Sequence, residues 1–182
     1  NPSSGIGTWI SPDGGVFSDP NDSAAILSGL VTAGQHWVYW TIDNNSCSSV
    51  DSVLITVDSL VVANAGSDQN FCENQTSTTL NAAAVTVGLG QWSTSSTAVI
   101  TDVNDPATSV TNLAAGSYLF TWTVTNNTCV STADVTITVD QLVVADAGTP
   151  QTVCSGTDIV LGANSASSGV GTWTSPDGGT FT

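Results

Sequence analysis

The sequence predicts an all-β chain built from repeated Greek-key β-sandwiches. Three observations predict this fold class: short runs in which apolar and polar residues alternate, turn-forming residues between these runs, and no run with the period of a helix. The clearest run is 116–125, where aromatic and aliphatic side chains alternate mostly with threonines. Asn126 and Asn127 tolerate the positive φ of a tight turn, and residues 132–139 alternate again. Together these stretches predict a β-hairpin.

The same stretch occurs earlier in the chain, so the sequence is a repeat array. Trp40 matches Trp122 and Cys47 matches Cys129, and both pairs are separated by the same interval in the sequence, which we call the period. We therefore expect a segment of a longer series of repeats. The period divides the sequence into the C-terminal part of one repeat without its first strands, one complete repeat, and the N-terminal part of a third: 1–58, 59–140 and 141–182.

The complete repeat is expected to hold about seven short strands around one core. Besides the hairpin, the strands are expected at 60–65 with an extension at 68–72, and at 77–83, 91–93, 98–101 and 109–113. The expected core residues are Leu80, Trp92, Tyr118, Trp122, Val135, Ile137 and Val139. A unit of this size buries a modest share of its surface, so each repeat is expected to need a disulfide or its neighbours.

The charge balance excludes two classes of partner. The sequence has no lysine or arginine, 15 acidic residues and one histidine, which gives a formal net charge of −15. Neutralising nucleic-acid phosphates requires lysine and arginine, so nucleic-acid binding is excluded. Anionic membrane surfaces would repel the chain, and no apolar run reaches the ~20 residues of a membrane span.

The four cysteines follow the period, since one period separates Cys47 from Cys129 and also Cys72 from Cys154. One pair in each small β unit is typical of disulfides in an oxidising, extracellular setting. Zinc binding is disfavoured because the sequence has no Cys-x-x-Cys and no histidine nearby. Three pairings stay open: Cys72 with Cys129 inside a repeat, Cys47–Cys72 together with Cys129–Cys154, or bonds between neighbouring repeats.

The only histidine, His36, takes the place that Tyr118 has in the next repeat. Tyr118 is interpreted as a tyrosine-corner residue, whose hydroxyl bonds back to the backbone. No nucleophile or acid forms a catalytic set with His36, so we expect a structural histidine and no enzyme activity.

Trp37 and Tyr39 alternate with core-facing residues and are therefore expected to point outward. Exposed aromatic rings stack on sugars or pack against another chain. Contact with a ligand or a fibre is one interpretation, and cover by a loop or an adjacent domain is the other.

Closely spaced acidic residues recur in both repeats, as Asp19 with Asp22 and as Asp102 with Asp105. Their oxygens are ligands that calcium prefers, which makes calcium a candidate cofactor. Aspartates at such positions also form ordinary Asx turns, and the spacing is not that of an EF-hand.

Two stretches carry a family resemblance. Residues 61–82, repeated at 143–164, resemble the opening of PKD-like and related immunoglobulin-like repeats, and residues 116–139 resemble the end of the same module. Together with the GTW and SPDGG elements and one cysteine pair per unit, they most resemble the surface-protein repeats of giant gliding-motility adhesins from Bacteroidetes-type bacteria. Residues 91–94 lack the Trp-Asp-Phe-Gly-Asp-Gly-like signature of classical PKD domains.

The resemblance implies tandem immunoglobulin-like (PKD-like) Greek-key sandwiches in a structural stalk or filament of a long secreted adhesin. Such a protein is located at the bacterial cell surface and serves attachment or gliding motility. Asp-Ser-apolar triplets at Ser23, Ser52 and Ser59 also resemble the O-glycosylation acceptor of the same bacterial group. The alternative function is a carbohydrate-binding or spacer module of a secreted multidomain hydrolase.

The connection between repeats is short. Residues 57–60 recur at 139–142, and neither stretch contains glycine or proline, so the last strand of one unit runs almost directly into the next unit. Such linkers predict a stiff rod whose partners are the neighbouring repeats. Surface polysaccharide or other copies in a filament are further candidate partners.

Overall fold

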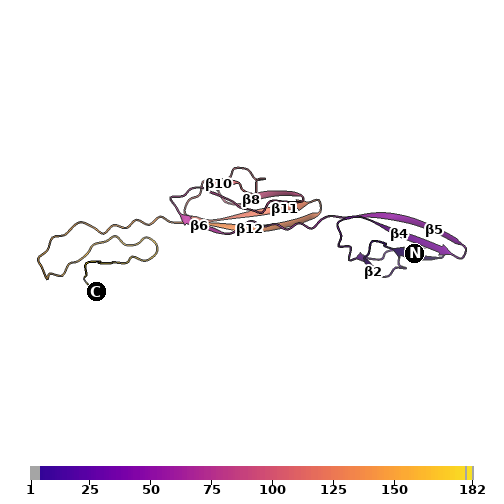
Figure 1. Cartoon of the computed structure of the whole chain (residues 1–182), viewed down its shortest axis with the longest axis horizontal. Helices are drawn as coiled ribbons and strands as arrows, with labels where there is room; N and C mark the ends of the chain where they lie inside the picture. The colour runs from indigo at the N-terminus through magenta and orange to yellow at the C-terminus, as the bar shows by residue number, and fades with distance from the viewer. Residues whose placement is uncertain (1–4, 179, 182) are drawn as a thin grey trace.

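The computed structural model describes residues 5–178 and 180–181. All the regular secondary structure in these residues is β-strand. Figure 1 shows three parts of the chain in succession along the long axis. The N-terminal part contains β1 (Ile6–Ile10), β2 (Val16–Phe17), β3 (Leu27–Ser28), β4 (Gly34–Asn44) and β5 (Cys47–Val57). Its main sheet has the order β1-β4-β5, and β2 pairs with β3.

The central part contains two sheets. Its strands are β6 (Gln69–Cys72), β7 (Thr78–Thr79), β8 (Leu89–Thr94), β9 (Val99–Ile100), β10 (Ser109–Thr111), β11 (Gly116–Asn126) and β12 (Cys129–Asp140). One sheet has the order β6-β12-β11-β8 and the other the order β7-β10-β9. Only β6 with β12 is a parallel pair among these strands. Two sheets of this kind form an immunoglobulin-like β-sandwich, which confirms the predicted fold class.

The core of the central part lies between its two sheets. The residues of the core cluster all fall within 61–139, so this unit closes a core of its own. At its centre the rings of Trp92 and Trp122 lie 5.0 Å apart at an interplanar angle of 47°. The expected core residues are buried: Leu80, Trp92, Tyr118, Trp122, Val135, Ile137 and Val139.

The predicted hairpin is confirmed as β11 and β12. Its register runs from Gly116 opposite Val139 to Asn126 opposite Cys129. Asn127 in the turn has φ 49°, and Asn45 in the equivalent turn of the N-terminal part has φ 54°. Asparagine tolerates this left-handed conformation better than most residues, which explains why the same residue type recurs at both turns.

Four strands are shorter than expected. Strands β9 and β10 cover only part of 98–101 and 109–113, and the other two differ more. No strand is assigned at 60–68, and the strand expected at 77–83 is reduced to β7. Single hydrogen bonds fasten these segments instead, such as the one from Ala82 N to the carbonyl oxygen of Pro106 at 3.0 Å. Because proline has no N–H, Pro106 cannot return a second bond, and the ladder does not extend past this point.

Residues 141–178 and 180–181 contain no assigned strand. They form extended segments that Asn164 holds together, because its side chain donates to the carbonyl oxygen of Val144 at 2.8 Å and its backbone N–H donates to that of Asp146 at 3.0 Å. Gly148 N also bonds Asp146 Oδ1 at 2.8 Å, as Gly66 N bonds Asn64 Oδ1 at 2.9 Å one period earlier. The local turn is therefore the same in both units.

Candidate functional site

The connection between the N-terminal and central parts is held by the β11–β12 hairpin. Asp58 directly follows β5, and its carboxylate accepts hydrogen bonds from Asn127 Nδ2 at 2.8 Å and from Thr128 Oγ1 at 2.9 Å. Thr128 N lies 3.3 Å from the same carboxylate, and Asn126 Nδ2 donates to the carbonyl oxygen of Ser59 at 3.0 Å. We call these five residues the Asp58 joint.

The electrostatics of the joint follow from these bonds. The hydrogen bond from Asn127, then those from the side chain and backbone of Thr128, hold the pKa of Asp58 below its ordinary value. All three donors favour the ionised carboxylate. The chain has no lysine or arginine that could pair with the Asp58 carboxylate in place of these donors. The hairpin tip of one unit thus holds the last residue of the unit before it.

An exposed apolar surface covers one side of the N-terminal sheet. Trp37 and Tyr39 on β4 are 46% and 36% exposed, so they point outward as predicted. Leu54 on β5 lies opposite Trp37, and Ile10 on β1 lies opposite Tyr39. We call Ile10, Trp37, Tyr39 and Leu54 the aromatic face. Its equivalent in the central part carries Leu119 in place of Trp37.

The tyrosine corner predicted at Tyr118 is present. Its hydroxyl accepts from Ala114 N at 2.8 Å and donates to the Ala114 carbonyl oxygen at 3.1 Å. In the N-terminal part His36 is buried at the same position, and its Nε2 donates to the carbonyl oxygen of Thr32 at 2.7 Å. Thr32 precedes Ala114 by one period, so the histidine replaces the tyrosine in the same backbone contact.

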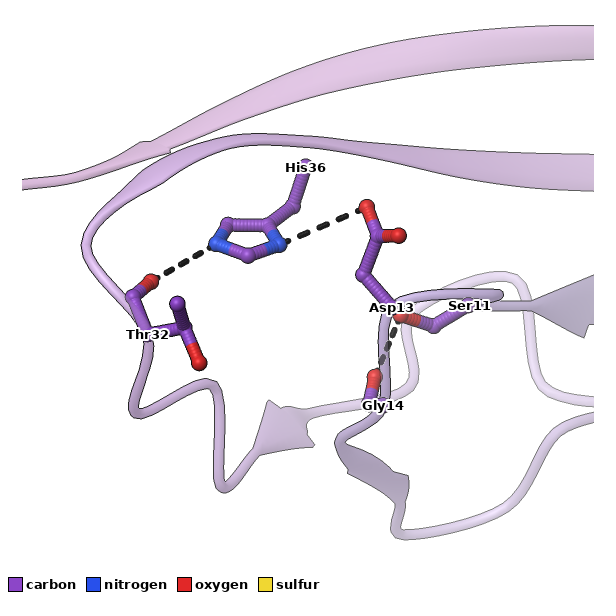
Figure 2. Close-up of polar contacts among 5 residues, drawn as sticks. All are labelled: Ser11, Asp13, Gly14, Thr32 and His36. Carbon is purple, nitrogen blue, oxygen red and sulfur yellow. Dashed lines mark hydrogen bonds and ion pairs between the residues drawn. The ribbon is translucent and has the colours of Figure 1, made fainter.

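Figure 2 shows how His36 lies between two loops. Its Nδ1 is 3.4 Å from Asp13 Oδ2, which is an ion-pair distance. Ser11 is on the same loop as Asp13, but its Oγ bonds the carbonyl oxygen of Gly14 and does not reach the ring. The three residues therefore do not have the contacts of a serine nucleophile with its base and acid.

The carboxylates of the four aspartates considered for calcium accept hydrogen bonds within their own turns. Asp19 Oδ1 accepts from Asn21 N at 2.9 Å, and Asp102 Oδ1 accepts from Asn104 N at 2.9 Å. Asp22 and Asp105 accept in the same way from backbone N–H groups two residues on. Within the described residues no three histidine, cysteine or acidic side chains gather as a metal site. Calcium stays a prediction without a grouped set of ligands.

The strand order bears directly on the cysteine pairings. Cys129 begins β12, whereas Cys72 lies opposite Asp140 at its other end. A strand of this length spans about 37 Å, but a disulfide needs Cα atoms within about 7 Å. The pairing of Cys72 with Cys129 inside one repeat is therefore wrong for this fold.

The second pairing fails for a similar reason. Cys47 begins β5 at the end farthest from the Asp58 joint, so the joint and the length of β12 separate it from Cys72. Cys154 lies in the segment that extends away from the Asp140 end of β12 (Figure 1), while Cys129 lies at the opposite end. All four thiols are free in this structure. Pairing between neighbouring repeats stays a prediction.

The serines considered for O-glycosylation have different surroundings. Ser23 and Ser52 are exposed, and Ser52 lies opposite Tyr39 beside the aromatic face. Ser59 is partly buried and belongs to the Asp58 joint. Glycosylation stays a prediction at all three.

The Asp58 joint is not among the sites that the sequence predicts. Two repeated patterns in the sequence indicate the joint only when they are considered together. One is aspartate at positions 58 and 140, and the other is Asn-Asn followed by serine or threonine at 44–46 and 126–128. Each alone indicates only a linker or a turn. Their contact requires the strand order, which places the hairpin tip of one unit against the end of the preceding one.

Comparison with known protein families gives a match to the central part. Residues 65–139 match the sequence profile of the family described as K319L-like, PKD domain. The central part is therefore similar to PKD domains, and we call it the PKD/Ig-like domain. Domains of this kind are typically non-catalytic. A search of curated proteins found no match to the chain.

Solved structures similar to the PKD/Ig-like domain and its flanking segments are distant. The solution structure of the PKD domain from KIAA 1837 protein is 23% identical, with a TM-score of 0.39, over 50% of this chain and 92% of that chain. The PKD domain from human KIAA0319 is 17% identical, also with a TM-score of 0.39, over 50% and 88%. BT4661, a SusE-like surface-located polysaccharide-binding protein from Bacteroides thetaiotaomicron, is 12% identical, with a TM-score of 0.32, over 73% and 29%.

The part of the chain that the structure describes has no helix suited to cross a membrane.

Proposed function

We propose that this chain is a stalk segment of a long secreted bacterial cell-surface adhesin that serves surface attachment or gliding motility. The observation that carries the proposal is the Asp58 joint. A stalk must transmit force and hold its tip away from the cell, so the angle between consecutive domains has to be fixed. Three hydrogen bonds to one carboxylate, with no spare residues in the linker, restrict that angle.

The composition suits this role. A surface of threonine, serine, asparagine and glycine with 15 acidic residues and no basic ones stays hydrated and repels other copies at long range. Trypsin-like proteases find no lysine or arginine to cleave. Both properties favour an exposed extracellular rod.

The test is the orientation of the N-terminal part relative to the PKD/Ig-like domain. We expect residual dipolar couplings of the native chain to fit one relative orientation, and Asp58→Ala to broaden it. Asp140→Ala is the matched control, because Asp140 is the equivalent of Asp58 and its side chain lacks a hairpin partner in this sequence. A native chain whose two parts reorient freely would refute the stalk.

The aromatic face supports a second candidate, a carbohydrate-binding or spacer module of a secreted multidomain hydrolase. Trp37 and Tyr39 lie two residues apart on one strand, and their rings are exposed on the same side. Flat, exposed ring pairs of this kind stack on sugar rings.

Binding to a glycan array tests the second candidate. If the face is a sugar platform, the double substitution Trp37→Ala and Tyr39→Ala should weaken binding roughly tenfold or more. Leu119→Ala, at the equivalent of Trp37 in the central unit, is the control and should leave binding unchanged. If the native chain binds no glycan, the carbohydrate-binding function is refuted and the proposed stalk function is unaffected.

A further inference from the structure

The two cysteines of the PKD/Ig-like domain lie at two different joints. Cys129 is at the N-terminal end of the domain, where its Sγ is 3.9 Å from the carbonyl oxygen of Asp58. It immediately follows Thr128, which binds the Asp58 carboxylate. The hairpin cysteine of one unit therefore lies against the last residue of the unit before it.

Cys72 has the corresponding position at the other end. It is the Cα partner of Asp140 in the parallel pair of β6 with β12. The next residue, Glu73, donates its N–H to the carbonyl oxygen of Asp140 at 2.8 Å, and its Oε2 is 3.4 Å from Leu142 N. This cysteine therefore lies beside the last residue of its own unit.

Because the sequence repeats, these two observations apply to equivalent joints. Asp58 and Asp140 are one period apart, in the matching stretches 57–60 and 139–142. At any joint of a continuing array, the aspartate thus has the β6 cysteine of its own unit as a strand neighbour and the hairpin cysteine of the following unit at its carbonyl oxygen. Both cysteines therefore lie next to the same aspartate.

We propose that a disulfide closes each joint, linking the cysteine equivalent to Cys72 in one unit to the cysteine equivalent to Cys129 in the next. The partner of Cys129 is then the cysteine one period before Cys72, and the partner of Cys72 is the cysteine one period after Cys129. Neither position is in the sequence, and the same holds for the partners that the proposal gives to Cys47 and Cys154, so the proposal agrees with the four free thiols of the structure.

The chemistry is thiol–disulfide exchange. The thiolate of one cysteine attacks an oxidising disulfide, either glutathione disulfide or a protein disulfide, and the second thiolate then attacks the resulting mixed disulfide. The two cysteines lose two protons and two electrons, and the oxidising disulfide becomes two thiols. Each joint then has two covalent connections, the linker and the disulfide, so it resists both bending and twisting.

The test needs one joint with both cysteines. We would insert a second copy of residues 59–140 directly after Asp140 of the full chain, and refold the protein with reduced and oxidised glutathione. The central unit closes its own core, so the added copy can fold. Alkylation followed by mass spectrometry should find two fewer free thiols than in the reduced chain.

Substitution in one copy at a time identifies the bond. Cys72→Ser in the first copy, or Cys129→Ser in the second, should abolish the disulfide and leave every remaining thiol free. The same changes in the opposite copies, Cys72→Ser in the second or Cys129→Ser in the first, should leave the disulfide in place. The proposal is overturned if no thiols are lost, or if the substitutions in the opposite copies abolish the bond. Neither result depends on the stalk function.

Discussion

At the scale of single residues, glycines let tryptophan rings lie against the backbone of the neighbouring strand. A Cβ at Gly90 would overlap Cζ2 of Trp122, and a Cβ at Gly7 would overlap the same atom of Trp40. Gly171, at the equivalent position of the third unit, has no atom within 4 Å of such a Cβ. The requirement for glycine thus arises from the facing ring.

Gly90→Ala should therefore destabilise the central domain by about 1–3 kcal/mol, because the buried ring of Trp122 must shift in a packed core. Gly171→Ala should leave the stability unchanged. Urea denaturation followed by tryptophan fluorescence measures the difference. Equal unfolding midpoints for the two variants would contradict this account of the core.

The sequence predicts which residues are buried in the core, but it does not predict their contacts with distant loops. The role of Tyr118 is predictable because a glycine and a strand pattern define its position, and that of His36 follows by the period. The contact of His36 Nδ1 with Asp13 Oδ2 joins strand β4 to a loop, and no alternation or spacing relates those positions.

At the scale of elements, the hairpin is predictable because its information is local: alternation along both strands and asparagine at the turn. The lengths of the outer strands are not. A strand ends where its partner stops offering hydrogen bonds, and for the segment after β7 that limit is Pro106 on a distant loop.

The third unit shows the same dependence on partners. Its sequence matches that of the central unit, yet no strand is assigned in its described residues. In the central unit β6 pairs with β12 and β8 pairs with β11, so both strands need the hairpin that comes later in the repeat. The positions one period beyond 116–140 are outside this sequence, so the third unit has no such hairpin here to pair with. Extended sequence becomes a strand only beside a partner.

At the scale of the whole molecule, the geometry of the chain should depend on pH through Asp58. Hydrogen bonds from Asn127 and Thr128 lower its pKa in the joint below the ordinary value of 3.8. A carboxyl group with a depressed pKa stabilises the joined state above the ordinary value, and this contribution is lost as the pH falls through the lowered value. Acidification should therefore release the hairpin tip from the linker.

We expect the orientation of the N-terminal part relative to the central domain to be fixed and independent of pH above 3.8, and to broaden reversibly below it. Residual dipolar couplings recorded along a pH series measure this. Asp58→Ala should already be broad at neutral pH and change little on acidification, which separates the joint from the titration of other carboxylates. If the variant and the native chain broaden over the same pH range, the carboxylate of Asp58 does not set the orientation, and the stiffness of the joint must come from the short linker alone.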